Sequence, residues 1–244
     1  LETIESLASD YDNVVTYRFK DGGSGSASRP RNKGLELCKE PYVTYLDPDN
    51  EAVNDGYAVL LEHAKREGVD FAVGTILKIA APAYRAVELS PSYSEGRNEN
   101  PRELLLSGGF KGQSVQACVI RRDFLVSSGI QNVVGAIGQD TLFYYEMMLN
   151  ASSFYHVRMP IHIYYAERAG SAVNKISRSF FDKSLLLEKQ QVKVLKKHGV
   201  LDAYKNIKLD AFMKGWYEEK LAHVVPEDRE YGEGAIFEIR SLYR

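Results

Sequence analysis

The segment YVTYLDPDNE, residues 42–51, carries the strongest indication of the architecture. Its first half, YVTYL, is a nearly continuous apolar run, which is typical of a strand buried on both faces of a parallel sheet. The run leads directly into Asp47-Pro48-Asp49. Open α/β sheets bind ligands beyond the carboxyl ends of their strands, and two carboxylates spaced by one residue can hold a hard divalent cation there. Taken alone, the same three residues also suit a plain Asp-Pro turn.

Helix and strand patterns alternate on both sides of this segment. Before it, residues 3–8 show helical spacing, residues 14–19 (VVTYRF) are β-branched and aromatic, and apolar residues at 35–38 indicate a helix. After it, residues 54–67 read as a helix and residues 71–80 (FAVGTILKIA) as a strand. Strands that alternate with helices indicate βαβ units and hence an α/β sheet.

Beyond residue 80 the expected elements are shorter. The pattern predicts a long loop at 81–100, a helix at 101–107, a Gly-rich turn at 108–112, a strand or helix at 115–120, a helix at 139–150 and two short strands broken at Pro160. From residue 177 onward, apolar residues recur at helical spacing. We therefore expect an α/β domain over residues 1–175 and a helical extension over residues 176–244, with Trp216 in its core.

The composition excludes several classes of protein. Of the 244 residues, 44% are hydrophobic and 26% are charged, so the chain is globular rather than disordered. The 31 Lys and Arg against 33 Asp and Glu give a net charge of -2, which argues against a protein that binds mainly nucleic acid. No apolar run approaches the ~18 residues that would span a membrane. Cys38 and Cys118 are expected to be buried thiols of a reduced protein, and the 5 histidines show no zinc-ligand spacing.

A second motif, GGSGSASRPRN at residues 22–32, precedes the first one. A Gly/Ser-rich turn that leads into a helix leaves backbone N–H groups free, and the nearby Arg29 and Arg31 suit a phosphate or the planar edge of a base. The segment is not a P-loop, because the Gly-Lys pair of that motif is absent. As an isolated string it also suits a solvated loop.

Two further motifs follow in the second half of the chain. Gly138-Gln139-Asp140 opens the expected helix at 139–150, where a carboxylate is either a helix cap or a general base on a rigid element. The segment YYAERAGS, residues 164–171, leaves an expected strand and contains Arg168, which can neutralise a departing phosphate. Each motif has a plain structural explanation by itself, so their order carries the interpretation.

In this order and spacing, the four motifs resemble the family 2 inverting glycosyltransferases of the GT-A fold. In that family a Gly-rich segment ending in Arg-Asn opens a helix, the next strand ends in an Asp-x-Asp metal motif, and an acidic pair opens the acceptor-side helix. A tyrosine-rich strand with Arg and Ser then closes the site. The resemblance covers about residues 1–175, and it is greatest to bacterial cell-surface polymer transferases, including those that decorate wall teichoic acid. It implies a Rossmann-like mixed sheet flanked by helices, followed by a helical appendage.

The resemblance also implies a role for each matching residue. Asp49 would bind Mn²⁺ or Mg²⁺ at the diphosphate of a nucleotide sugar, which we expect to be a UDP-sugar. Asp140 would be the catalytic base that deprotonates the acceptor hydroxyl, although the family's usual acid before the base is Gln139 here. The residues expected to bind the donor are Arg31, Asn32, Asp47, Arg168 and Ser171, and Gln113 and Tyr165 are expected near the acceptor.

One part of the family pattern does not occur in the sequence. Members open with a strand of the VSVIIPVYN kind and continue to a second strand that ends in Asp-Asp-Gly-Ser, and neither is present. We therefore expect the first βαβ unit to be lacking, and with it one wall of the donor pocket. The expected acceptor is a glycan or a cell-surface polymer, and the expected location is the cytoplasm or the inner face of the membrane. The helical extension could join copies of the chain.

Two other functions are compatible with the same residues. A non-catalytic module derived from a transferase domain would bind a glycan or a partner chain, without metal-dependent affinity for UDP. A nucleotidyltransferase also builds a metal site from carboxylates on an α/β sheet. The sequence shows no Lys-rich and Gly-rich activating loop after an N-terminal strand, which argues against the nucleotidyltransferase.

Overall fold

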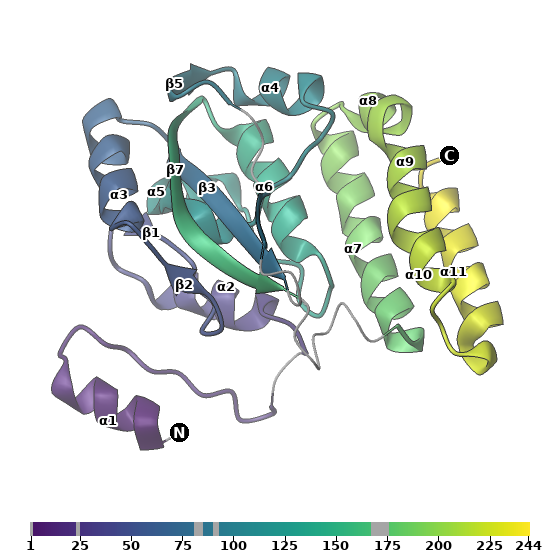
Figure 1. Cartoon of the computed structure of the whole chain (residues 1–244), viewed down its shortest axis with the longest axis horizontal. Helices are drawn as coiled ribbons and strands as arrows, with labels where there is room; N and C mark the ends of the chain where they lie inside the picture. Colours follow the sequence, from purple (N-terminus) through teal and green to yellow (C-terminus); the bar gives the residue numbers. More distant parts are fainter. Residues whose placement is uncertain (1, 23–24, 81–84, 90–92, 167–175) are drawn as a thin grey trace.

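The computed structural model describes residues 2–22, 25–80, 85–89, 93–166 and 176–244. Over these residues the chain forms a mixed seven-stranded sheet flanked by helices, which confirms the α/β class (Figure 1). The elements in chain order are α1 (Glu2–Asp10), α2 (Ser28–Leu37), β1 (Tyr42–Val43), β2 (Glu51–Ala52), α3 (Gly56–Glu67), β3 (Phe71–Ala80), β4 (Arg85–Glu88), β5 (Gly96–Glu99), α4 (Pro101–Ser107), β6 (Cys118–Arg121), α5 (Arg122–Ser128), α6 (Gln139–Asn150), β7 (Ser153–Ala166), α7 (Arg178–Lys197), α8 (Leu201–Tyr204), α9 (Asp210–Phe212), α10 (Glu219–Leu221) and α11 (Arg229–Leu242). Short 3₁₀ turns lie at Val115–Ala117 and Pro226–Asp228, and π-helical turns at Lys205–Leu209 and Met213–Glu218.

The sheet is built around one parallel pair of strands, β3 and β7. The strand order is β1-β6-β3-β7-β2, with β4 on β3 and β5 on β7, and these other pairs are antiparallel. The expectation of a strand at 42–46 inside a parallel sheet is wrong, because β1 has two residues and pairs antiparallel with β6 at the edge. At the next residue the hydroxyl of Thr44, rather than the backbone, donates to the carbonyl of Cys118 at 2.8 Å, and the chain turns away from the sheet.

Alternating residues of β3 supply two hydrophobic cores, one on each face of the sheet. Ala72 and Ile76 are buried with Leu60 of α3 on one face. Phe71 and Val73 belong to the other core, which includes α6 and the helices that follow. This alternation is the period of two that a strand imposes. In Figure 1, α3 covers one side of the sheet, and α6 lies between the sheet and the group of helices from α7 to α11.

Two predictions made for the middle of the chain are wrong. The segment 81–100, expected to be a long loop, contains β4 and β5, which extend the sheet beside β3 and β7. The second error concerns β7, which runs through Pro160 as one strand instead of two. The register between β3 and β7 shifts on both sides of the pair Thr75↔Pro160. The proline, which has no N–H to donate, therefore sits at a local irregularity of the ladder, where a strand tolerates it.

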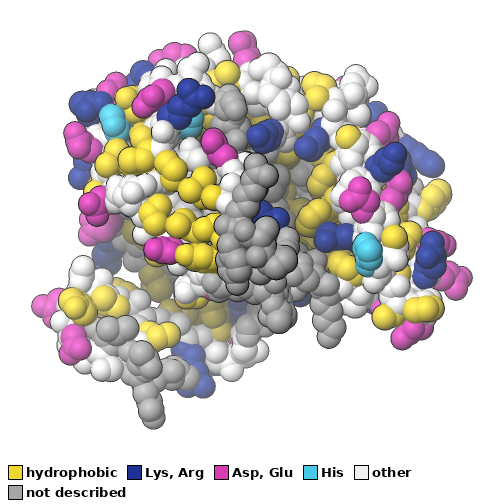
Figure 2. Space-filling model, viewed as in Figure 1, with side chains coloured by type: hydrophobic (Ala, Val, Ile, Leu, Met, Phe, Trp, Pro, Cys, Tyr) yellow, Lys and Arg dark blue, Asp and Glu magenta, His cyan; other side chains and the backbone are white. Residues whose placement is uncertain are grey.

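The expected strand at residues 14–19 is absent from the part of the chain that the structure describes. These residues follow α1 along an arm that lies apart from the sheet, where Figure 2 shows exposed hydrophobic side chains in yellow. Val15 is 72% exposed and Tyr17 is 55% exposed. The arm meets α2 through two cations: the Arg29 guanidinium lies 4.1 Å from the centre of the Phe19 ring, and the Lys33 amine 4.9 Å from that of Tyr17. Composition predicted a strand here, but a strand also needs a neighbour to complete its hydrogen bonds.

The predicted helical region is confirmed from α7 to α11. Its buried side chains join the same core as α6, because Phe181 and Leu195 of α7 cluster with Phe143 and Met147. The core thus runs across the expected boundary at residue 175, and the division into two domains stays a prediction. Among the described residues, we find no helix with the length and apolar character that crossing a membrane requires.

Both cysteines carry free thiols, as expected, but the expectation that both are buried is right for Cys118 and wrong for Cys38. Cys118 is fully buried in β6, and burial raises the pKa of its thiol. Cys38 is only half-buried, at the end of α2. Cys118 is therefore a core residue, and a thiol with a raised pKa is a poor nucleophile.

Candidate active site

A cavity of about 900 Å³ brings together residues that are far apart in the sequence. One side of it is formed by the loop before α2, the turn after β1 and the end of β7. The first turn of α6, which packs against Gly112, also lines the cavity. A further side is formed by α7 and the Met213–Glu218 segment. The expected site residues that line this cavity are Arg31, Asp47, Gln113 and Asp140.

Asp47 is the centre of a hydrogen-bond network on the sheet side of the cavity. Arg31 Nη2 donates to both carboxylate oxygens of Asp47 at 2.9 Å, and the amide of Gln116 donates to Oδ2. The Gln116 Oε1 atom in turn accepts from Asn50 Nδ2 at 2.8 Å. The backbone N–H of Asn50 donates to the carbonyl of Asp47 at 3.2 Å and closes a turn. The Asp-Pro-Asp segment is therefore a turn, and its first carboxylate is fixed at the cavity wall.

Two donors of Arg31 are unused in the part of the chain that the structure describes. Its side chain comes from α2 and only 9% of the residue is exposed, yet Nε and Nη1 have no partner among the described residues. The ring of Tyr45 lies beside the guanidinium, 6.0 Å away, and burial raises the pKa of Tyr45 to about 12. Leaving buried donors unpaired costs free energy. A ligand with acceptor atoms, such as a phosphate or the edge of a base, would satisfy them.

His162 on β7 completes this side of the cavity and was not singled out from the sequence. The residue is 0% exposed. Tyr57 donates its hydroxyl hydrogen to the carbonyl of Gln116 at 2.6 Å, so it accepts from His162 Nδ1 at 3.1 Å. The Nε2 atom is then an acceptor without a partner among the described residues. Burial lowers the pKa of His162, while the charges of Asp47 and Asp49 oppose this.

Asp140 reaches the cavity from the first turn of α6. The helix begins after Gly138, whose φ of 75° is in the region that favours glycine. Asp140 Oδ1 accepts from the backbone N–H of Thr141 at 3.0 Å, and the positive end of the helix stabilises a carboxylate there. Gly112 packs so closely on this turn that a Cβ atom at its position would lie 2.7 Å from Thr141 Cγ2. These contacts hold a half-buried carboxylate on a rigid element at the cavity wall.

Gln113, which lines the cavity, and Asn32, which does not, both hold neighbouring segments together. The Gln113 amide donates to the carbonyl of Gly74 at 2.9 Å, which ties the turn before β6 to β3. The Asn32 amide donates to the carbonyl of Asn132 at 2.8 Å and accepts from the N–H of the same residue at 2.8 Å. Asn32 thereby joins α2 to the loop before α6 and does not line the cavity. Its expected role in donor binding stays a prediction.

Four other expected site residues are not brought into the cavity wall by the described structure. Asp49 is exposed on the turn after Asp47. The hydroxyl of Tyr165 donates to Glu51 Oε2 at 2.5 Å, outside the lining. Arg168 and Ser171 lie outside the described residues. The roles assigned to these residues stay predictions.

The helical region supplies one side of the cavity, which the sequence did not predict. Trp216, expected in the core, is half-buried and lines the cavity together with Phe180 and Lys183. The amine of Lys183 donates to the carbonyl of Gly25 at 3.2 Å and links α7 to the loop before α2. Helical spacing shows which residues share a face, but not which face meets a distant loop. The sequence therefore held no signal for these contacts.

The fold and the cavity suit a class of protein that would bind a phosphorylated or heterocyclic ligand beside a fixed carboxylate. The comparison with protein families makes the class specific. Residues 1–126 match the family described as Glycosyl transferase family 2, and the chain belongs to this family. The family resemblance inferred from the four motifs is thereby confirmed.

Two curated glycosyltransferases are similar to the chain over most of its length. It is 24% identical over 199 residues to the uncharacterized glycosyltransferase YibD of Escherichia coli strain K12, which covers 80% of this chain and 56% of that protein. It is 26% identical over 229 residues to the cholesterol galactosyltransferase of Borreliella burgdorferi, which covers 89% of this chain and 62% of that protein. The chain thus spans 56% to 62% of the length of these relatives.

The structural comparison concerns the fold. Residues 1–349 of S. aureus TarS, in a complex with UDP-GlcNAc, align with a TM-score of 0.58 and 15% identity, over 98% of this chain and 77% of that one. The same protein in a complex with UDP aligns with a TM-score of 0.56 and 14% identity. The expected glycosyltransferase fold of the GT-A type is thereby confirmed.

Proposed function

We propose that the chain transfers a sugar from a UDP-sugar to a hydroxyl of a glycan or cell-surface polymer, with inversion at the anomeric carbon. The observation that carries this proposal is the cavity itself, whose lining brings Arg31, with its unsatisfied buried donors, together with Asp140. The complex of TarS with UDP-GlcNAc supports a uridine nucleotide as the donor, and the galactosyltransferase of Borreliella supports a hexosyl group.

The roles of the residues follow from their positions in the cavity. Arg31 Nε and Nη1 bind the nucleotide part of the donor, and Asp47 keeps the guanidinium in place through its two 2.9 Å hydrogen bonds. Asp140 accepts the proton of the acceptor hydroxyl. The acceptor oxygen then forms its bond to the anomeric carbon while the bond from that carbon to the diphosphate oxygen breaks on the opposite face. Because Asp140 is held on α6, no large movement is needed to present the base.

The proposal includes a divalent cation, Mn²⁺ or Mg²⁺, beside the turn at Asp49. Among the described residues, no three His, Cys, Asp or Glu side chains converge on one point. The protein would supply Asp49 and Nε2 of His162, which has no partner among the described residues, and the diphosphate and water would supply the other ligands. When bound, such a cation neutralises charge on the departing diphosphate.

Donor turnover tests the function in the full-length chain. UDP release would be measured with UDP-GlcNAc, UDP-galactose and UDP-glucose, with and without Mn²⁺, in the wild type and in Asp140→Asn. Asp21→Asn is the matched control, because Asp21 is an exposed carboxylate that pairs with Arg29 at 2.8 Å. We expect turnover that Asp140→Asn lowers about a thousandfold and Asp21→Asn preserves. Binding of UDP without turnover of any of the three donors would contradict the enzyme and favour a binding module.

The cation is tested separately by Mn²⁺ binding. Electron paramagnetic resonance measures free Mn²⁺ in a titration of the protein with UDP present. Asp49→Asn and His162→Asn should each weaken Mn²⁺ binding about tenfold or more, as loss of a ligand does in other metal sites. In the wild type, coupling to an imidazole nitrogen should appear in the pulsed spectrum and disappear in His162→Asn. Equal Mn²⁺ affinity in all three proteins would show that neither Asp49 nor His162 binds the cation and would contradict this site.

A further inference from the structure

Positive charge is concentrated where α7 ends. Residues 192–208 (VKVLKKHGVLDAYKNIK) contain 5 lysines and 1 aspartate and so carry a charge of +4, whereas the whole chain carries -2. Arg102, near the start of α4, joins them, because its Nη1 atom donates to the carbonyl of His198 at 2.9 Å. In Figure 1, α4, the end of α7 and α8 lie together along one edge of the molecule. The term basic surface is used below for the cations Arg102, Lys193, Lys196, Lys197, Lys205 and Lys208.

Most lysines of the basic surface point to solvent without a counter-charge. Lys196 and Lys197 follow Lys193 by three and four positions, so the three exposed side chains share one face of α7. In the described part of the chain, neither Lys193, Lys196 nor Lys208 forms an ion pair. Lys205 pairs with Asp202 at 3.5 Å, and such an exposed pair is weak. The described residues therefore leave most of this positive charge uncompensated.

The cations contributed by α4 and α7 act at the same place. Burial lowers the pKa of His198, and the charges of Lys197 and Arg102 lower it further. Two exposed carboxylates, Asp202 and Glu103, lie next to the basic surface in the chain, against its six cations. The positive potential is thus shared between two elements that are about 90 residues apart in the sequence, and it is a property of the folded surface.

An exposed apolar side chain lies within the basic surface. Ile207 is 50% exposed on the π-helical turn Lys205–Leu209, between Lys205 and Lys208. A Cβ atom at Gly109 would lie 3.8 Å from Ile207 Cγ2, so this turn packs beside the end of α4. Single apolar residues are common on protein surfaces, so the charge carries the inference and Ile207 adds to it. Cations around an apolar side chain suit the interface of an anionic bilayer.

The position and the composition of the basic surface favour a bilayer over a single polymer chain. Its cations lie at helix ends on an outer edge of the molecule, and none of them lines the 900 Å³ cavity. Five of the six are lysines, whose ammonium groups attract phosphates as point charges. Arginine would supply the paired donors that suit recognition of individual phosphates. The surface therefore fits a diffuse layer of anionic headgroups.

We propose that the basic surface docks the protein on a membrane that contains anionic phospholipid, with Ile207 entering the headgroup layer. Each Lys or Arg close to such a membrane adds attraction, which falls off within a Debye length of about 8 Å. Ile207 follows Tyr204 by three positions and precedes Phe212 by five, and both of these residues line the cavity. Docking would therefore bring the helical side of the cavity near the membrane. The inference goes beyond the proposed transferase function and does not depend on it.

Sedimentation with lipid vesicles tests the docking of the full-length chain. One set of vesicles contains one part phosphatidylglycerol to two parts phosphatidylcholine, and the other contains phosphatidylcholine alone. We expect binding to the mixed vesicles that about 0.5 M salt abolishes, and no binding to phosphatidylcholine. Combining Lys193→Gln, Lys196→Gln and Lys197→Gln should weaken binding about a hundredfold, at about fivefold for each lysine.

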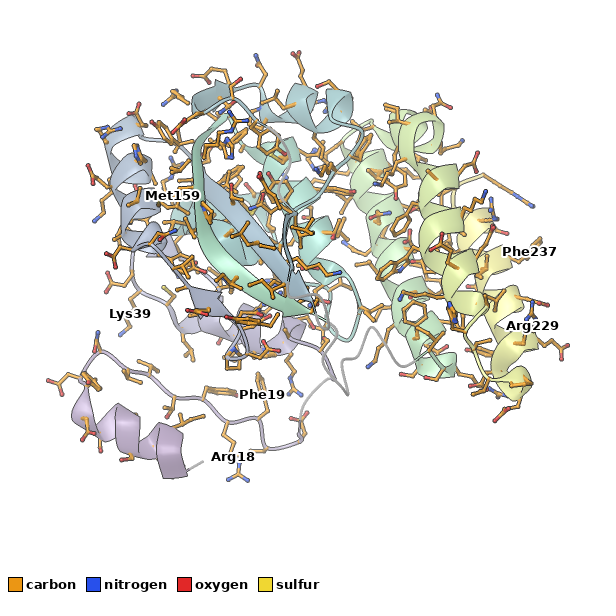
Figure 3. The ribbon with its side chains drawn as sticks, in the orientation of Figure 1. Arg18, Phe19, Lys39, Met159, Arg229 and Phe237 are labelled. Carbon is orange, nitrogen blue, oxygen red and sulfur yellow. The ribbon has the colours of Figure 1, made fainter. Side chains whose placement is uncertain are left out.

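A matched control removes three lysines elsewhere on the surface. Lys20→Gln, Lys39→Gln and Lys65→Gln change the net charge equally, and these exposed residues lie on the arm, after α2 and on α3. Figure 3 shows Lys39 on the side of the molecule away from α7 and α8. This triple variant should bind the mixed vesicles within about threefold of the wild type.

The apolar contribution is tested by Ile207→Ser, which should weaken vesicle binding about fivefold at low salt. Val126→Ser is its control, because Val126 is 55% exposed on α5, and this change should leave binding unaltered. Equal binding by the wild type and Ile207→Ser would overturn the entry of Ile207 into the headgroup layer.

Three other results would overturn the docking surface. One is equal weakening by the two triple variants, which would show attraction by net charge alone. Another is equal binding to both kinds of vesicle, since the lipid charge would then play no part. The third is binding to inorganic polyphosphate without binding to the mixed vesicles, which would assign a soluble polyanion instead. Failure of the transferase function is recognised independently, as absence of UDP release from every donor, because vesicle binding is measured without a donor.

Discussion

Two polar networks border the cavity, and they differ in whether their hydrogen bonds are complete. On the sheet side, Asp47 is paired with Arg31, but Arg31 Nε and Nη1 and His162 Nε2 are buried without partners among the described residues. On the helical side, the carboxylate of Glu188 accepts from Tyr217, Tyr243 and Gln191. None of the buried atoms of the Glu188 network is left without a partner in the described structure.

The difference separates a binding site from a structural support. An unpaired buried donor or acceptor costs about 1 to 3 kcal/mol, and native proteins keep few of them. The sheet-side network retains that cost in residues of the cavity lining, where the proposed donor would supply the missing partners. The Glu188 network retains none, although it contains a carboxyl group and no cation. Burial raises the pKa of Glu188, and the hydroxyls of Tyr243 and Tyr217 oppose this.

The largest expected effect is on Asp140, which lines the same cavity. Asp140→Asn removes the base but keeps the shape and a hydrogen-bonding side chain. Turnover should fall about a thousandfold, within the range that general base catalysis contributes, while the affinity for UDP should stay within about twofold. Steady-state UDP release and calorimetry with UDP measure the two quantities. A parallel loss of UDP affinity would show that Asp140 serves the donor instead.

The next effect concerns the stability of the helical side. Glu188→Ala leaves the hydroxyls of Tyr217 and Tyr243 and the amide of Gln191 without their acceptor, so unfolding free energy should fall by about 3 to 4 kcal/mol. Glu188→Gln keeps an acceptor oxygen and should lose less. Urea unfolding followed by circular dichroism gives these values.

The control for Glu188 is Glu238→Ala, which removes an exposed ion pair with Lys189 of 2.9 Å. Exposed pairs contribute about 0 to 1 kcal/mol. If Glu188→Ala were no more destabilising than Glu238→Ala, the Glu188 network would not stabilise the helical region beside the cavity. If it abolished UDP binding while the protein stayed folded, the separation of the two networks would be wrong.

A third carboxyl, Glu146 of α6, gives a pH dependence with a definite sign. Burial raises the pKa of Glu146 to about 7, and the charge of Lys197 only partly opposes this. The folded protein therefore binds the proton more tightly than the unfolded chain does. Stability should fall as the pH rises from the ordinary Glu pKa through about 7, and Glu146→Gln should remove that fall.

The magnitude of this effect follows from the size of the shift. At pH 8, Glu146→Gln should be more stable than the wild type by roughly 2 to 3 kcal/mol, and at pH 4 the two should be equal. Thermal unfolding over this pH range tests the expectation, with Glu103→Gln on the exposed side of α4 as the control. Parallel pH curves for the wild type and Glu146→Gln would contradict it.

Features that depend on a few neighbouring residues could be predicted from the sequence. The apolar run of β3, the helix start before Asp140 and the turn at Asp47 follow from spacing and from turn chemistry over a few residues. Gln116 lies 69 residues from Asp47 in the chain, and no local pattern marks it as a partner. The same holds for Trp216, whose helical spacing fits a core position equally well.

The errors in the fold have a similar cause. Pairing decides whether a β-rich segment becomes a strand, and pairing is not visible in composition. Residues 14–19 have the composition of a strand but no neighbour in the described structure, whereas β4 has a neighbour in β3. No local spacing marks His162, because its position arises from the pairing of β2 with β7.

The smallest of the four effects tests whether the open donors of Arg31 serve a ligand. Arg31→Gln removes Nε and Nη1 along with the bond to Asp47, and a lost charged hydrogen bond costs about 2 kcal/mol. Affinity for UDP should therefore fall about thirtyfold. Arg29→Gln is a close control, because Arg29 lies two positions earlier on α2 and pairs with Asp21 at 2.8 Å, outside the cavity lining. Calorimetry with UDP measures both. If Arg31→Gln lowered the unfolding free energy by this amount and left UDP affinity unchanged, the unsatisfied atoms would be a cost of the fold, and incomplete hydrogen bonding would not mark the donor site.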